Sequence, residues 1–288
     1  MASKPTHLEP SELGTREYWD NLYTKELTNH AHDPSDTGTV WFDDSDAEAK
    51  VIEFLEDFAP EEAGGLLPPG AKGAASFLDL GTGNGSLLFG LRDAGWRGRM
   101  LGVDYSRRSV EFARRIARSR STTTATTGAE AEEEEEEEGK EKDTEPEDVE
   151  FLEHDILLTP PSALLSGAQS RGWDVVLDKG TFDAVSLSSE TDPARGGRRV
   201  GESYRARILP LVRGGGGLFL VTSCNWTEEE LRGWFVGGGA DEQEEDEEAR
   251  AWKFEEVGKV EYPSFSFGGV KGQTISTLCF RKVRNPRS

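Results

Sequence analysis

The chain has 288 residues, of which 35% are hydrophobic and 31% charged, so it can bury one sizeable core but not the cores of two full domains. Its net charge of −22 comes mainly from two acidic segments, because residues 130–150 carry −12, residues 241–250 carry −6 and the rest only −4. This balance argues against a nucleic-acid-binding surface, the two cysteines lack the spacing of a metal site or a disulfide framework, and no apolar run reaches the ~20 residues that cross a bilayer.

Two amphipathic helices are predicted in the first part of the chain. Aromatic and leucine side chains share one face of a helix over residues 14–27. Ser45 and Glu48 have the spacing of a capping box ahead of a second helix, which carries Val51 and Leu55 on its apolar face.

Trp41 and Phe42 end the loop that precedes the second helix. They either anchor the core or form a lid over a bound ligand. A connector rich in glycine and proline follows over residues 60–73 and marks a boundary. We therefore expect residues 1–73 to form N-terminal helices with a Trp41–Phe42 lid segment, and residues 74–288 to form the main domain.

A glycine-rich turn follows the strand predicted over residues 76–80. Its spacing is Gly-x-Gly-x-Gly, whereas a dinucleotide fingerprint would need a third glycine where Ser86 stands. Asp79, just before the turn, would repel a pyrophosphate but attract an ammonium group, so the turn favours S-adenosylmethionine over NAD. The candidate cofactor-binding residues here are Asp79, Gly81, Thr82, Gly83, Asn84 and Gly85.

The next two strands bring carboxylates to the same edge of the predicted sheet. Residues 99–104 predict a strand that ends in Asp104, 19 residues beyond the last glycine of the turn, the offset at which an acid binds ribose hydroxyls. Asp104 could instead cap the helix that follows Tyr105. A third strand over residues 149–156 carries Asp155 near its end, within reach of an adenine amino group.

Two segments of biased composition interrupt this pattern. Residues 121–148, rich in threonine and then glutamate, predict a disordered insertion, and residues 237–250 predict a second acidic insertion. Between them, residues 173–178 predict a fourth strand that delivers Asp178 and Phe182 to the ligand-binding edge. The reacting centre is expected there.

The last strands decide the fold class. Residues 217–222 form an apolar run suited to a buried fifth strand, and Thr227 with Glu230 predicts a capped helix. Residues 253–262 and 274–283 predict two strands without a helix between them, so they should pair antiparallel at the sheet edge. The predicted class is α/β, a Rossmann-like doubly wound sheet that is mostly parallel and has an antiparallel C-terminal hairpin strand.

In this order the motifs resemble the class I S-adenosylmethionine-dependent methyltransferases. A narrower resemblance, to the protein-lysine N-methyltransferases that modify translation elongation factor 1-alpha, is carried by residues 18–20, 38–42, 178–184, 223–227 and 265–269. The Asn/Asp-Pro-Pro-Tyr/Phe motif of amide and adenine N-methyltransferases is absent, and Asp178-Lys179-Gly180-Thr181 stands in its place. This difference counts against a glutamine or nucleobase acceptor. The acidic insertions are not part of the family pattern.

The resemblance implies an enzyme with S-adenosylmethionine as its cofactor and no metal. Beside the turn and Asp104, the cofactor-binding residues that it implies are Trp41, Tyr105, Asp155 and Asp178. Asp178 is also expected to orient the acceptor amine, which must be neutral for an in-line displacement, although it could be an ordinary turn contact. Phe42 and Phe182 are expected to enclose the lysine stem of the substrate.

Two other functions remain open from the sequence: a small-molecule N- or O-methyltransferase, and a cofactor-binding adaptor without turnover. The preferred function is lysine methylation of a protein substrate, translation elongation factor 1-alpha. We expect a cytoplasmic monomer with no nucleic acid or membrane partner.

Overall fold

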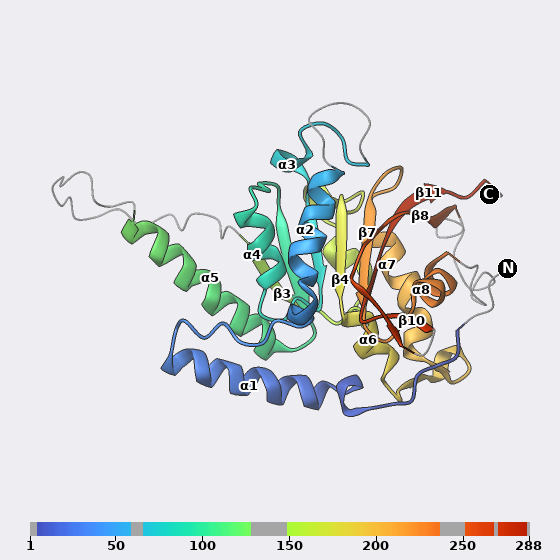
Figure 1. Ribbon diagram of the computed structural model, residues 1–288, viewed down its shortest axis with the longest axis horizontal. Helices are drawn as coiled ribbons and strands as arrows, with labels where there is room; N and C mark the ends of the chain where they lie inside the picture. The colour runs from blue at the N-terminus through green and yellow to red at the C-terminus, as the bar shows by residue number, and fades with distance from the viewer. Residues whose placement is uncertain (1–4, 59–65, 128–148, 237–250, 268–269, 287–288) are drawn as a thin grey trace.

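The computed structural model describes residues 5–58, 66–127, 149–236, 251–267 and 270–286 (Figure 1). Of the two expected insertions, residues 128–148 and 237–250 lie outside this part of the chain. Residues 121–127 are helical and continue α5 (Arg107–Thr127), so the disorder predicted from residue 121 is wrong for this stretch. None of the helices in these ranges is both long enough and apolar enough to pass through a lipid bilayer.

A seven-stranded sheet in the order β3-β2-β1-β4-β7-β11-β8 forms the centre of the described fold. The neighbours from β3 to β7 are parallel. β11 lies antiparallel between β7 and β8, which confirms the predicted pairing of the two C-terminal strands. The strands are β1 (Phe77–Leu80), β2 (Met100–Asp104), β3 (Glu150–Glu153), β4 (Val175–Lys179), β7 (Leu218–Ser223), β8 (Trp252–Val260) and β11 (Ser276–Arg284).

Two short hairpins lie outside this sheet. β9 (Ser264–Phe267) and β10 (Val270–Gln273) pair antiparallel, where the sequence predicted only a loop between the last two strands. β5 (Thr191–Asp192) and β6 (Arg198–Arg199) form the other pair. The first hairpin corrects the prediction and lengthens the C-terminal antiparallel part of the protein.

Helices cover both faces of the sheet. Alternate strand residues point to opposite sides, and because the strands carry apolar side chains on both sides, each face has to be covered. On β7, Leu218 and Leu220 pack into the core that α1, α2, α4 and α5 share, whereas Phe219 and Val221 pack against α6, α7 and α8. These helices are α1 (Arg16–His32), α2 (Ala47–Asp57), α4 (Ser86–Asp93), α6 (Thr181–Ser186), α7 (Tyr204–Ile208) and α8 (Glu228–Phe235). The parallel strands are therefore buried on both faces, as their continuous apolar runs predict.

Shorter helical turns complete the described chain. They are α3 (Ala71–Ala74), η1 (Glu12–Gly14), η2 (Asp43–Ser45), η3 (Pro161–Leu164), η4 (Gly167–Gln169), η5 (Pro193–Arg195), η6 (Val200–Ser203) and η7 (Leu209–Leu211).

Helix α1 is longer than predicted and lies along the edge where the parallel strands end (Figure 1). It thereby covers the side of the sheet on which ligands of α/β proteins bind.

The two predicted capping boxes have different outcomes. Thr227 and Glu230 form the box at the start of α8. The box predicted for α2 is wrong, because Asp46 holds the cap position without a side-chain bond. Glu48 instead accepts a hydrogen bond from Ser86 Oγ at 2.6 Å. Its carboxylate therefore fastens α2 to α4 rather than capping its own helix.

Candidate active site

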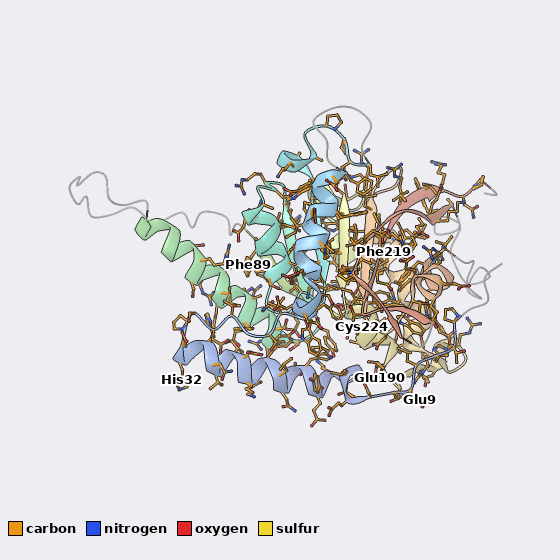
Figure 2. The ribbon with its side chains drawn as sticks, viewed as in Figure 1. Glu9, His32, Phe89, Glu190, Phe219 and Cys224 are labelled. Atoms are coloured by element: carbon orange, nitrogen blue, oxygen red, sulfur yellow. The ribbon has the colours of Figure 1, made fainter. Side chains whose placement is uncertain are left out.

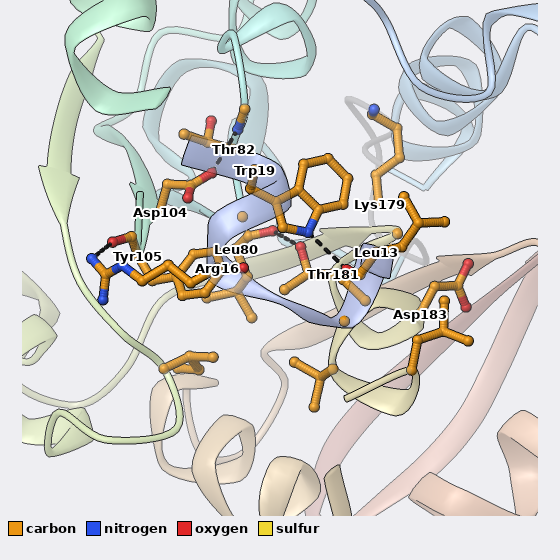
Figure 3. Close-up of a pocket in the computed structure, with 18 of the residues that line it drawn as sticks. Leu13, Arg16, Trp19, Leu80, Thr82, Asp104, Tyr105, Lys179, Thr181 and Asp183 are labelled. Carbon is orange, nitrogen blue, oxygen red and sulfur yellow. Dashed lines mark hydrogen bonds between the residues drawn. The ribbon is translucent and has the colours of Figure 1, made fainter. Parts of the chain in front are cut away.

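A cavity of about 290 Å³ lies at the carboxyl edge of the parallel strands. Its wall combines the N-terminal segment, the glycine turn after β1, the ends of β2 and β3, and the segments after β4 and β7. Figure 3 shows Asp104 and Tyr105 on one side, Lys179 and Asp183 on the other, and Leu80 with Thr181 between them. The cavity thus runs along the edge of the sheet from β3 to β7.

The glycine turn needs glycine for two separate reasons. Gly81, Gly83 and Gly85 have φ of 62°, 59° and 81°, a left-handed conformation that residues with a Cβ adopt at a cost. A Cβ on Gly81 would also lie 2.1 Å from Thr181 Oγ1. Thr181 in turn donates to the carbonyl oxygen of Leu80 at 2.6 Å, so α6 is packed directly on the turn. Gly81 and Gly83 line the cavity without a side chain of their own.

Asn84 joins the glycine turn to the N-terminal segment. Its Nδ2 donates to the carbonyl oxygens of Thr37, at 2.9 Å, and Thr39, at 3.4 Å, and its Oδ1 accepts from the Ser86 amide at 3.1 Å. Asn84 and Thr82 both line the cavity, as the sequence predicted. The polar atoms of Asn84 are, however, already used to hold the chain over the turn.

Asp104 lies at the end of β2 and is only 6% exposed. Its Oδ2 accepts from the Gly83 amide at 3.2 Å and from Ser109 Oγ at 2.8 Å, and its Oδ1 accepts from the Ser106 amide at 2.8 Å. Burial raises the pKa of the carboxyl to about 6. Asp104 bonds the backbone ahead of α5 and also lines the cavity, where its binding of ribose hydroxyls stays a prediction.

Tyr105 and Asp155 complete this end of the cavity. The Tyr105 carbonyl accepts a hydrogen bond from Arg16, whose guanidinium carbon lies 5.2 Å from the centre of the tyrosine ring. Asp155 Oδ1 accepts from the amides of Leu157 and Leu158, at 3.0 and 3.1 Å. Both predicted residues line the cavity. Arg16 lies there too, and nothing in its sequence context distinguished it from other surface arginines.

His154 lies between the end of β3 and Asp155. It is 5% exposed and lines the cavity, and its Nε2 has no hydrogen-bond partner among the described residues. Burial lowers its pKa, so the ring is neutral near pH 7 and its Nε2 is free to serve a ligand.

Trp41 and Phe42 both lie on the cavity wall. The Trp41 Nε1 is buried and has no partner within the described chain. Lys179 holds this segment, since its Nζ donates to the Trp41 carbonyl at 3.2 Å and lies 3.3 Å from the Glu48 carboxylate. Phe42 has a φ of 67°, which costs a residue with a side chain about 1–2 kcal/mol. Neighbouring contacts therefore hold the segment in one conformation.

Four predicted site residues do not line the cavity: Asp79, Gly85, Asp178 and Phe182. Asp178 is 2% exposed and accepts hydrogen bonds from the Thr181 amide at 2.9 Å and the Tyr204 hydroxyl at 2.6 Å. Its carboxylate is turned into the start of α6, where it cannot orient an acceptor amine. Phe182 is 1% exposed and stacks on Tyr204, with ring centres 5.2 Å apart, so it belongs to the core and not to a substrate slot.

Gly85 and Asp79 are the other two of these residues. Gly85 adjoins Phe151, whose ring a Cβ at this position would meet at 2.7 Å. Asp79 comes just before the turn. It is 3% exposed and lies beneath the glycine turn, and burial raises the pKa of its carboxyl to about 7. The structure therefore places it behind the wall that the turn forms, and not in direct reach of a ligand in the cavity.

Asp183 lies on the cavity wall, although the sequence did not predict it as a site residue. It is the third residue of α6, and its carboxylate accepts hydrogen bonds from Ser223 Oγ and, at 2.9 Å, from the Cys224 amide. Cys224 follows β7 and lies below Phe219 in Figure 2, at the carboxyl end of that strand. The only sequence signal for Asp183 was its place in the stretch 178–184.

Comparisons with known proteins agree with this architecture. A family model described as a methyltransferase domain matches residues 71–269. The chain is 36% identical to "Protein-lysine N-methyltransferase EFM4" of Saccharomyces cerevisiae, over 96% of each chain. It is 32% identical to "EEF1A lysine methyltransferase 2" of Danio rerio, over 98% of this chain and 92% of that one. It is 30% identical to the Homo sapiens protein of the same name, over 95% of this chain and 88% of that one.

Proposed function

The chain belongs to the methyltransferase family of these protein-lysine methyltransferases, and from that premise we propose that it transfers a methyl group from S-adenosylmethionine to a lysine of translation elongation factor 1-alpha. The observation that carries the proposal is the similarity at 30–36% identity over nearly the whole chain to relatives with this named activity. The residues that line the cavity suit the cofactor of such an enzyme.

The cavity wall suits the cofactor in three respects. Gly81 and Gly83 line the cavity and have no side chain, so a ligand can approach the main chain of the turn closely. Asp104 and Asp155 lie next to it along the sheet edge and keep free lone pairs for ribose hydroxyls and an adenine amino group. Trp41 offers an unused N–H donor, which fits the carboxylate of an amino-acid moiety. When bound, S-adenosylmethionine supplies a methyl group on a positively charged sulfur.

The protein's own residues have to position the acceptor and keep water away. Trp19, Trp41 and Phe42 form an aromatic wall on one side of the cavity, and Leu13 with Gly14 lies on the N-terminal side. Such an enclosure holds the two reactants in line, which is the main requirement for a displacement without a covalent intermediate.

The proposal is tested with the purified full chain and S-adenosylmethionine that carries a labelled methyl group. Elongation factor 1-alpha and a pool of small metabolites are offered separately as acceptors. We expect label in the protein and none in the metabolites. Label in the metabolites alone would identify a small-molecule methyltransferase, and donor binding without any transfer would identify an adaptor.

A further inference from the structure

Asp183 lies apart from the residues that suit the adenosyl cofactor. Asp155, Asp104 and the glycine turn follow β3, β2 and β1, which are consecutive strands of the sheet. Asp183 follows β4 and is bonded to the end of β7, the next two strands. A ligand that extends along the first three strands therefore leaves the β4–β7 end of the cavity for the acceptor, and Asp183 is a carboxylate at that end (Figure 3).

The orientation of Asp183 is fixed by hydrogen bonds from the segment that ends β7 and follows it. Ser223 Oγ donates to Oδ1, and the Cys224 amide donates to Oδ2 at 2.9 Å. Ser223 Oγ is itself anchored, because it accepts from the amides of Asn225 and Trp226 at 3.1 and 2.9 Å. The Cys224 thiol and the Asn225 amide also lie within hydrogen-bonding reach of the carboxylate. The group is thus held in place before any substrate arrives, as a site for a cation requires.

The charge of Asp183 has no counterion within the described residues. The side chain is 5% exposed, and no lysine or arginine of the described chain forms an ion pair with it. Hydrogen bonds offset part of the cost of burying the carboxylate, and a cation would offset more of it. Burial raises its pKa, which agrees with a charge that lacks a partner.

The surroundings of Asp183 also suit the stem of a lysine. The Phe42 ring lies over the main chain of Gly180, where a Cβ would come within 3.2 Å of two ring atoms. Phe42, Gly180 and Asp183 line the same cavity. A cavity lined by both an apolar ring and a carboxylate matches a side chain with four methylene groups and a charged end.

We propose that Asp183 binds and orients the ε-ammonium group of the acceptor lysine at the β4–β7 end of the cavity, the role that the sequence suggested for Asp178. This inference rests on the proposed function. It concerns binding of the acceptor before transfer and assigns Asp183 no bond-forming step. A carboxylate next to the amine favours the ammonium form. It therefore raises both the affinity for the lysine and the pKa of the bound amine.

Other ionisable groups near Asp183 bear on any pH profile. From β4, burial raises the pKa of Asp178 to about 7 and the Asp183 charge adds to this rise, while Lys179 is held by Glu48. The effect of Asp183→Asn on the profile is therefore also measured in an Asp178→Asn background, where a shift cannot come from Asp178. After β7, desolvation and the Asp183 charge raise the pKa of the Cys224 thiol to about 12, so the thiol stays neutral. A shift of the profile near neutral pH on changing Asp183 thus cannot arise from Cys224.

The test compares wild type with Asp183→Asn, using labelled S-adenosylmethionine and elongation factor 1-alpha. We expect donor affinity by calorimetry to change less than about 2-fold, and KM for the protein acceptor to rise about 10- to 100-fold, the loss of a charged hydrogen bond. The pH at which kcat is half-maximal should fall, since the bound amine loses its stabilising negative charge. An unchanged acceptor KM and an unchanged profile overturn the inference.

Two further variants separate binding from a structural role. Asp183→Glu keeps the charge, and should restore the wild-type pH profile even if its KM is raised. Ser223→Ala keeps the charge but removes one anchor, and should raise KM without moving the profile. If Asp183→Asn does not fold, a shifted profile in either of these variants overturns the inference. A wild-type protein that does not label the elongation factor refutes the proposed function itself, which is a different outcome.

Discussion

Replacing Gly81 by alanine tests why the turn contains glycine. The left-handed φ of 62° costs an alanine about 1–2 kcal/mol. The new Cβ would lie 2.1 Å from Thr181 Oγ1, so the threonine must rotate and lose its 2.6 Å bond to Leu80. That bond contributes about 0.5–1.5 kcal/mol. Gly81→Ala should therefore destabilise the protein by about 1.5–3.5 kcal/mol.

A second background separates the two contributions. In Thr181→Ala the hydroxyl is absent, and the nearest remaining atom of residue 181 is its Cβ at 3.1 Å, a contact that a small shift relieves. Gly81→Ala should then cost only the backbone contribution, about 1–2 kcal/mol. The assay is urea unfolding followed by tryptophan fluorescence for the four proteins of the cycle. Equal costs in the two backgrounds, within about 0.5 kcal/mol, would refute the proposed contact with Thr181.

Three further predictions concern residues beneath and around the cavity. Burial raises the pKa of Asp79 to about 7, so the folded protein disfavours its charged form, and the stability of wild type relative to Asp79→Asn should decline as pH rises from about 4 to about 7. Urea unfolding at about pH 5 and about pH 8 measures this difference, and an equal or reversed difference contradicts the effect of burial. Trp41→Phe keeps an aromatic ring but removes the unpartnered Nε1–H, so the affinity for S-adenosylmethionine, measured by calorimetry, should fall about 10-fold at unchanged Tm. Full affinity would show that the Nε1–H does not bind the cofactor. Lys179→Met removes the bonds to Trp41 and Glu48, so amide hydrogen exchange over residues 39–46 should become faster, and exchange at the wild-type rate would show that Lys179 does not hold this segment.

The sheet was predictable because its strands carry their own signals. The apolar run that became β7 is buried on both faces, and the two C-terminal strands have no room between them for a helical crossover. The glycine spacing likewise located the turn, since left-handed φ values leave little choice of residue. Asp104, Tyr105 and Asp155 reached the cavity because the ends of parallel strands meet at one edge.

The acceptor end was not predictable in the same way. Asp178 and Asp183 are five residues apart on one short stretch, and their roles depend on partners distant in sequence. The Tyr204 hydroxyl and the amides of α6 bind Asp178 inside the fold, whereas Ser223 and Cys224 hold Asp183 on the wall. Glu48 was misassigned for the same reason, because its partner Ser86 lies in another helix. Local spacing identifies the edge of the sheet but not which carboxylate faces the cavity.

The most direct test of the account is peptide mass spectrometry of translation elongation factor 1-alpha after reaction with the purified protein and S-adenosylmethionine that carries a deuterated methyl group. The account predicts deuterated methyl groups on a lysine of the elongation factor, in an amount that falls with Gly81→Ala and with Asp183→Asn. Elongation factor without labelled lysine, under conditions in which calorimetry shows that the donor is bound, would contradict it.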